Sequence, residues 1–126
     1  MARVIVCGGR AYSDLETVYR TLDALLPSLE ALACGGAPGA DTLALEWARG
    51  RGFPCDVFMA DWQAHGRAAG PIRNQRMLEE FRPTLVIAFP GGRGTADMVR
   101  RAHGAGVTTI AFLENEAESS NSGLVH

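Results

Sequence analysis

The residues best suited to chemistry lie in the stretch FPGGRGTAD, residues 89–97. An apolar run over residues 85–89 predicts a short buried strand, and a helical pattern begins at Thr95 or Ala96, just after the glycines. At such a turn from strand to helix, unpaired backbone N–H groups and the helix dipole stabilise an anion. Glycines let the backbone approach a phosphate closely, and an arginine adds a planar, permanently charged group. The predicted anion-binding residues of this turn are Gly91, Gly92, Arg93, Gly94 and Thr95.

The same arrangement recurs at two earlier points in the chain. Gly8–Gly9 and Gly35–Gly36 each follow a strand-like run, and an aspartate comes six residues after the first glycine of each pair. The three aspartates with this spacing are Asp14, Asp41 and Asp97. Capping of a helix, or stabilisation of its dipole, is the structural interpretation of these carboxylates. The functional alternative is that one of them stabilises a reacting ligand.

Five strand-like runs alternate with four helical patterns along the chain. The strands are expected at residues 3–7, 30–34, 54–59, 85–89 and 107–113. This alternation predicts an α/β fold with a doubly wound parallel sheet and helices on both faces. We expect the strand order 3-2-1-4-5, which opens a ligand crevice at the carboxyl ends of the first and fourth strands.

A long polar loop over residues 60–70 must cross this crevice. It carries Trp62, a candidate surface for stacking a base, and Arg67, a candidate contact for phosphate or ribose together with His65. The alternative is that Trp62 closes the edge of the core and the charged residues are solvated. In the following helix, Arg73 and Asn74 lie one turn before Met77 on the buried side, so they can reach over the sheet edge.

Three arginines, Arg10, Arg73 and Arg93, are therefore expected to converge on the glycine turns. This convergence indicates an anionic ligand of nucleotide size. The candidate ligand-binding residues are Gly8, Gly9, Arg10, Gly35, Gly36, Asp41, Trp62, Arg67, Arg73, Asn74, Gly91, Gly92, Arg93, Gly94 and Thr95.

Composition narrows the class of protein. The 126 residues suit one domain, and an apolar share of 47% excludes a disordered chain. No apolar run approaches the roughly 20 residues that span a bilayer, and no signal pattern opens the chain. Cys7, Cys34 and Cys55 lack metal-ligand spacing, so we expect buried, inert thiols in a reducing cytoplasm, with no metal and no cofactor. A net charge of −2 weighs against general nucleic-acid binding.

Four segments resemble the SLOG superfamily, and within it the YspA/cpYpsA-related family. They are CGGRAYSD (7–14), GGAPGADTLALEWA (35–48), ADWQAHGRAAGPIRNQRML (60–78) and FPGGRGTADMV (89–99). The resemblance implies a Rossmann-like domain over residues 1–113 that binds a nucleotide-derived ligand such as AMP, ADP-ribose or NAD, as a sensor or a processing enzyme. Residues 114–126 would then be a polar tail, either disordered or packed on a partner.

More distantly, the chain resembles the Lonely Guy phosphoribohydrolases and the DNA-processing protein DprA. Lonely Guy enzymes carry PGGxGTxxE, in which the glycines hold phosphate and the Glu serves N-glycosidic hydrolysis with an upstream Arg. Here Met98 holds the Glu position and Asp97 precedes it. The resemblance matches Arg73 to the upstream Arg, and among Asp14, Asp41 and Asp97 we expect Asp97 to be the catalytic carboxylate that acts with Arg73 in such a hydrolase.

Two other functions stay open. One is a DprA-like module that binds nucleic acid or assembles proteins, which would need a basic surface strip. The other is a structural homo-oligomer whose glycine turns serve only the fold. The expected partners are a small nucleotide-derived ligand and, from the alanine-rich helix faces, a second copy in a homodimer.

Overall fold

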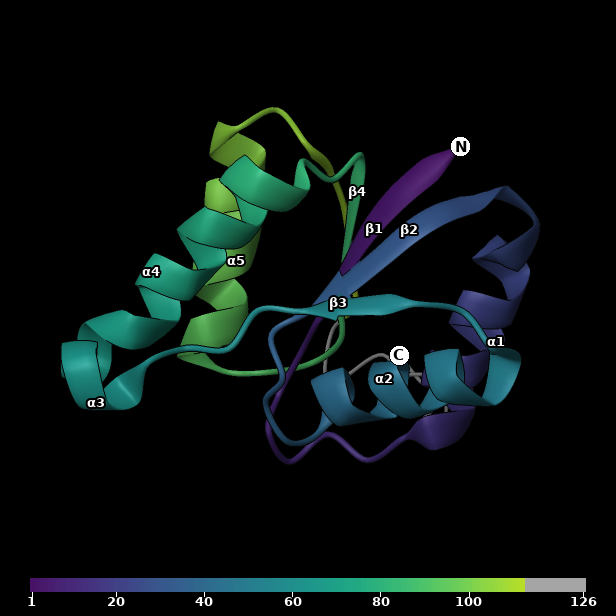
Figure 1. Ribbon diagram of the computed structural model, residues 1–126, viewed down its shortest axis with the longest axis horizontal. Coiled ribbons are helices and arrows are strands. Elements are labelled where there is room, and N and C mark those ends of the chain that lie inside the picture. Colours follow the sequence, from purple (N-terminus) through teal and green to yellow (C-terminus); the bar gives the residue numbers. More distant parts are fainter. Residues whose placement is uncertain (113–126) are drawn as a thin grey trace, which may run out of the picture.

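The fold is built on a parallel sheet of five strands in the order β3-β2-β1-β4-β5. Figure 1 shows the computed structural model, which describes residues 1–112. The strands are β1 (Ala2–Cys7), β2 (Leu29–Cys34), β3 (Cys55–Val57), β4 (Leu85–Ala88) and β5 (Thr108–Ala111). All four neighbouring pairs run parallel, so the predicted α/β class and strand order are confirmed. No helix within the described residues is long and apolar enough to cross a membrane.

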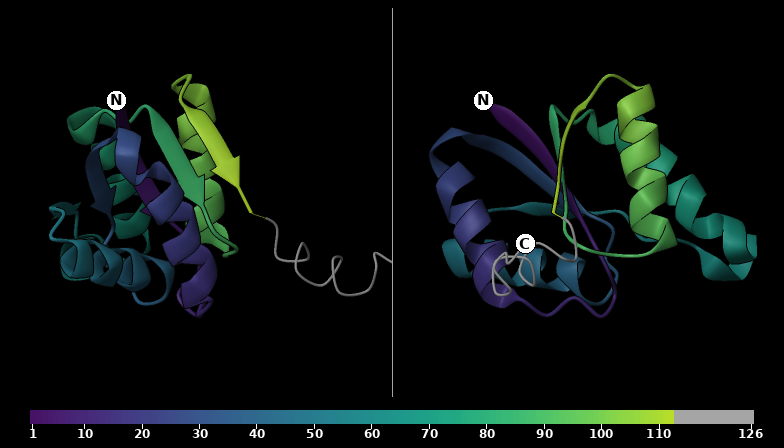
Figure 2. Two further views of the ribbon diagram at one scale, coloured as in Figure 1. Left: turned by 90° about the vertical axis from the view of Figure 1, so that its right-hand side faces the viewer. Right: turned by 180° about the vertical axis from the view of Figure 1, so that it is seen from behind.

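Helices cover both faces of the sheet. Two lie on one face, α1 (Leu15–Leu25) and α2 (Ala40–Arg51), and two on the other, α4 (Ala69–Arg76) and α5 (Arg93–Gly104), as Figures 1 and 2 show. A five-residue π-helical turn, Met77–Phe81, continues α4. Two 3₁₀ turns, Leu26–Ser28 and Gly66–Ala68, complete the helical segments together with the short α3 (Trp62–His65).

The core is divided by the sheet into two clusters because successive residues of a strand point to opposite faces. On β1, Val4 and Val6 pack against α1 and α2, while Ile5 packs against α5 and the turn Met77–Phe81 that continues α4. All three side chains are fully buried, as expected for a central strand covered on both sides. Phe89, directly after β4, is also fully buried and stacks with Tyr12, so the loop after β1 is fixed beside the end of β4.

Several predicted boundaries differ from the structure. The third strand ends at Val57, two residues earlier than expected, and α5 begins at Arg93, before the expected Thr95 or Ala96. The predicted loop over residues 60–70 contains α3, which Asp61 caps by accepting a hydrogen bond from Ala64 N (3.0 Å). This helix has no buried residue, so it leaves no apolar periodicity in the sequence. The last residue of the predicted fifth strand and the predicted tail, residues 113–126, lie outside the described residues.

Candidate functional site

The carboxyl ends of the central strands open onto a cavity of about 760 Å³. It lies where the strand order reverses, because β1 pairs with β2 on one side and with β4 on the other. A cavity of this size suits a small-molecule ligand. The predicted site residues that line it are Gly8, Gly9, Arg10, Gly35, Gly36, Asp41, Trp62, Arg67, Arg73, Asn74, Gly92, Arg93, Gly94, Thr95 and Asp97.

Gly91 is the predicted site residue outside this lining, and its role is to let two turns touch. Gly9 N donates to Pro90 O (2.9 Å), and a Cβ at Gly9 would lie 2.8 Å from that same carbonyl oxygen. A Cβ at Gly91 would collide with Gly9 N and with the hydroxyl of Thr95. The turns after β1 and β4 therefore need glycine at both positions for packing alone.

Gly92 and Gly94 differ from these packing glycines. Among residues 1–112, no atom would lie within 4 Å of a Cβ at either position, and neither residue has a positive φ. The fold therefore does not require glycine at these two positions. Their bare backbone lines the cavity at the start of α5, where the close approach of a ligand would explain the missing side chain.

The N-terminus of α5 supplies unpaired donors to the cavity wall. Gly92 is the N-cap and makes no side-chain capping bond, and the first helical hydrogen bond runs from Ala96 N to Gly92 O (3.0 Å). The backbone amides of Arg93, Gly94 and Thr95 have no acceptor among residues 1–112. These amides and the positive end of the helix dipole favour an anion here.

Asp41 is a buried carboxylate with one oxygen fixed and the other unpaired. Its Oδ2 accepts hydrogen bonds from Gly35 N and Ala37 N, both at 3.1 Å, so it holds the turn after β2. Its Oδ1 is buried and has no hydrogen-bond partner within the described residues. Burial raises the pKa of Asp41 to about 6, against the opposing effects of the two amides and of the Arg73 charge.

Arg73 also contacts Gly35 and is tethered through part of its guanidinium. Its Nη1 donates to the carbonyls of Gly35 (2.7 Å) and Phe58 (3.4 Å), and its Nε donates to Asn74 Oδ1 (3.1 Å). These bonds use three of its five N–H groups. The two on Nη2 have no acceptor in the part of the chain that the structure describes.

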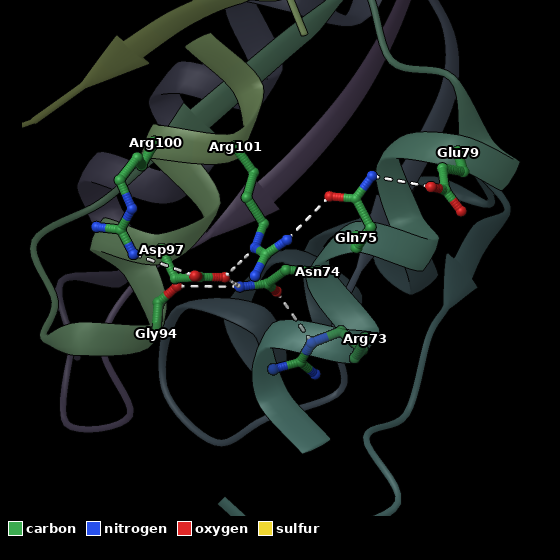
Figure 3. A network of polar contacts seen from close by, with 8 residues as sticks. All are labelled: Arg73, Asn74, Gln75, Glu79, Gly94, Asp97, Arg100 and Arg101. Atoms are coloured by element: carbon green, nitrogen blue, oxygen red, sulfur yellow. Dashed lines mark hydrogen bonds and ion pairs between the residues drawn. The ribbon is translucent and has the colours of Figure 1, made fainter. Parts of the chain in front are cut away.

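Asp97, expected to be catalytic, is bound by three side chains (Figure 3). Asn74 Nδ2 and Arg101 Nε both donate to its Oδ2, at 3.0 and 2.8 Å, and Arg100 Nη2 donates to its Oδ1 at 3.2 Å. Asn74 Nδ2 also reaches the carbonyl of Gly94 (3.2 Å), so this cluster ties α4 to the first turn of α5. Burial alone would raise the pKa of Asp97, but the bonds from Asn74 and Arg101 and the two arginine charges lower it.

Trp62 and Arg10 border the cavity at its exposed side. The Arg10 guanidinium lies 5.7 Å from the centroid of the Trp62 ring, and the Trp62 side chain is 49% exposed. Trp62 therefore does not close the core, which is the role of Trp47 at 1% exposure. Arg67 also lines the cavity, whereas His65 lies outside the lining.

Comparisons with known proteins identify the family. The model of the YspA, cpYpsA-related SLOG family matches residues 2–65. The chain is also 39% identical over 122 residues to the Gene 61 protein of Mycobacterium phage D29, which covers 89% of this chain and 97% of that protein. The chain belongs to the YspA, cpYpsA-related SLOG family.

A solved structure supports the fold of this SLOG-family chain. DNA processing protein A (DprA) from Streptococcus pneumoniae superposes with a TM-score of 0.72 at 19% sequence identity. The match covers 97% of this chain and 54% of the DprA chain, so this chain spans about half the length of that protein. At this level of identity the similarity concerns the fold.

Asp14 and Cys7, the other residues of the SLOG domain that could do chemistry, have surroundings that explain them by the fold. Asp14 caps α1, because its two oxygens accept from the amide (3.1 Å) and the hydroxyl (2.6 Å) of Thr17. Cys7 lines the cavity, but burial and the negative charge of Asp41 raise the pKa of its thiol to about 12, which keeps the thiol protonated at neutral pH. Within residues 1–112, no cluster of three His, Cys, Asp or Glu residues is placed to hold a metal.

Part of the lining was not predicted from the sequence. Three methionines border the cavity: Met59, Met77 and Met98. In the sequence, their apolar side chains indicate only strand or core positions. Ala37 and Pro38 complete the turn after β2. The double glycine before them was the signal that this turn approaches the site.

Proposed function

We propose that this protein binds a nucleotide or a nucleotide-derived ligand, such as AMP, ADP-ribose or NAD, through a phosphate at the start of α5. The observation that carries the proposal is a set of three backbone amides, those of Arg93, Gly94 and Thr95, that have no acceptor in the described part of the chain and border a cavity of about 760 Å³. The guanidinium of Arg93 belongs to the same wall and adds a permanent positive charge.

The charges of the cavity support an anionic ligand. Four arginines line it, while the carboxylates among the described lining residues are those of Asp41 and Asp97. Asp97 is already neutralised by Arg100 and Arg101 at 3.2 and 2.8 Å. The remaining balance is positive, and a cavity of this kind concentrates anions from solution.

The rim offers a surface for the other end of a nucleotide. A half-exposed indole such as that of Trp62 stacks well on a base, and the neighbouring Arg10 can extend the stack. Phosphate at α5 and a base at Trp62 would use two walls of one cavity. A base stacked on Trp62 is therefore part of the proposal.

Whether the ligand is only sensed or also processed depends on a carboxylate. N-glycosidic hydrolysis needs a carboxylate that faces the ribose, and all three donors around Asp97 occupy its oxygens. Asp41 has one oxygen that no described residue pairs, and its pKa of about 6 is close to the range of a general acid or base. For any hydrolysis we therefore assign the carboxylate role to Asp41 in place of Asp97, with Arg73 beside it.

A thermal-shift and calorimetric titration tests the binding proposal. AMP, ADP-ribose and NAD are compared with inorganic phosphate on the wild type, on Arg93→Ala and on a charge-matched control, Arg49→Ala, whose side chain is exposed and outside the cavity. A ligand at 100 times its Kd should add about 2.7 kcal/mol of stability. Arg93→Ala should weaken binding at least about tenfold, and Arg49→Ala should not.

Absence of binding by all three nucleotides would refute the proposal. Equal binding by Arg93→Ala and Arg49→Ala would refute the location at α5. Binding of DNA in place of nucleotides, with an affinity that falls steeply with salt, would favour the DprA-like alternative. We also keep the homodimer and the cytoplasmic location as proposals; light scattering of the purified protein tests the homodimer.

A further inference from the structure

Asp41 lines the cavity, and one of its carboxylate oxygens lacks a hydrogen-bond donor within the described residues. The residue is 5% exposed, its Oδ2 is already held by two backbone amides, and its Oδ1 is buried without a partner in the described chain. Buried polar atoms are nearly always paired, so an unpaired one beside a cavity points to a partner that arrives there. The arriving group must donate a hydrogen bond.

The surroundings of Asp41 narrow the chemistry of that donor. A phosphate oxygen carries no proton to donate at neutral pH and would be repelled by the carboxylate. An ammonium group would meet the positive charges of the four arginines that line the cavity. A neutral donor, such as a hydroxyl group, satisfies Oδ1 without either conflict.

Arg73 contacts the same glycine as Asp41 and has two unused donors. A Cβ at Gly35 would lie 2.5 Å from Arg73 Nη1 and 3.0 Å from Asp41 Oδ2, so one backbone position touches both side chains. The two N–H groups of Arg73 Nη2 have no acceptor within residues 1–112. The two side chains therefore meet at Gly35, and both line the cavity with hydrogen-bonding groups that no residue within 1–112 uses: Oδ1 of Asp41 and the N–H groups on Nη2 of Arg73.

We propose that Asp41 and Arg73 form a subsite for the vicinal hydroxyls of a ribose, which makes the ligand a ribonucleotide derivative. One hydroxyl donates to Asp41 Oδ1, and the neighbouring hydroxyl oxygen accepts from Arg73 Nη2. The inference rests on the proposed function, because the phosphate at α5 brings the sugar into the cavity. It adds a selection against 2′- or 3′-deoxyribose that the phosphate site cannot supply.

The test needs no variant in its first arm. Calorimetry on the wild-type protein at pH 7.5 compares AMP with 2′-deoxy-AMP and 3′-deoxy-AMP. Hydrogen bonds to charged groups are strong, so loss of the hydroxyl that contacts Asp41 should weaken binding about tenfold or more. Equal affinity for the three compounds overturns the ribose subsite, including the case in which a water molecule alone satisfies Oδ1.

The second arm uses Asp41→Asn. The Asn carbonyl can still accept from Gly35 N and Ala37 N, while its NH₂ group takes the place of Oδ1 and turns an acceptor into a donor. AMP should then bind about tenfold more weakly, within about threefold of the deoxy compounds. The matched control is Asp14→Asn, which changes an aspartate at the same spacing after a double glycine but outside the cavity.

The two proposals fail in different ways. If neither AMP nor the deoxy compounds bind the wild type, the phosphate site itself is refuted, and the ribose subsite with it. If all three bind equally and Arg93→Ala weakens all three, the phosphate site stands and the ribose subsite is refuted. A full preference for AMP retained in folded Asp41→Asn, checked by circular dichroism, would remove Asp41 from the subsite.

Discussion

Replacing Asp41 by asparagine should stabilise the free protein at neutral pH. The carboxylate is 5% exposed, and burial raises its pKa from an ordinary value of 3.8 to about 6. This difference corresponds to about 3 kcal/mol between the charged and neutral forms in the folded protein. Asparagine carries no charge to desolvate and can still hold the turn after β2 through its carbonyl oxygen.

The sign of the pH dependence follows from the direction of this pKa shift. In the unfolded chain Asp41 loses its proton near pH 3.8, whereas in the folded protein it keeps the proton until about pH 6. Between these values the folded state binds more protons, so this residue's contribution to stability falls as pH rises and is fully lost above pH 6. The advantage of Asp41→Asn over the wild type should therefore grow by about 2.4 kcal/mol from pH 4 to pH 7, because part of the shift already acts at pH 4.

Urea unfolding at pH 4, 5, 6 and 7 measures this difference. Taking the variant minus the wild type at each pH cancels the titration of all other groups, provided that the m-values agree. Asp14→Asn is the control: hydrogen bonds from the hydroxyl and amide of Thr17 lower the pKa of Asp14, so its small effect has the opposite sign. A difference between Asp41→Asn and the wild type that stays constant with pH would refute the claim that Asp41 is a desolvated, incompletely paired carboxylate.

Three further predictions use the same protein preparations. Gly91→Ala should lower the free energy of unfolding by about 1 to 3 kcal/mol, because its Cβ collides with the turn after β1. Gly92→Ala should change the free energy of unfolding by less than about 0.5 kcal/mol but weaken AMP binding. Equal effects of the two variants in urea unfolding would contradict this difference between the two glycines. AMP should quench the fluorescence of exposed Trp62 and not that of buried Trp47, so quenching that persists in Trp62→Phe would exclude the stacking role. Asp97→Asn should lower stability by about 1 to 2 kcal/mol at pH 7, and by progressively less as pH falls below 4. The variant should keep its affinity for AMP within about threefold of the wild type. A large loss of AMP affinity in calorimetry would show that Asp97 contacts the ligand.

The fold was predictable because its signals are periodic and local. Runs such as residues 3–7 are apolar throughout, which indicates a strand covered on both faces, and alternation with helices fixes a parallel sheet. The start of α5 was placed too late because Arg93 and Gly94 precede the first buried residue of the helix, Asp97, and give no apolar signal. The short α3 has no buried residue and for the same reason gives no helical signal in the sequence.

The three aspartates show where prediction from spacing ends. Asp14, Asp41 and Asp97 each follow a double glycine by the same interval, yet Asp14 caps a helix through Thr17, three residues away. Asp97 instead binds Asn74, which is 23 residues away in the sequence and was not a predicted partner. Spacing predicts the path of the backbone, but the role of a carboxylate depends on the groups that tertiary packing brings to its second oxygen.

By that criterion, Asp41 is the carboxylate available to a ligand. Its turn occupies one oxygen through two amides, and no described residue reaches the other. For the fold alone, a residue that closes this turn with a single acceptor would stabilise the protein more than a carboxylate with one unpaired buried oxygen. The carboxylate therefore imposes a cost on the free protein that a bound hydroxyl group would offset. A gain in stability on replacing Asp41 and a loss of the preference for ribose would both follow from the same unpaired oxygen.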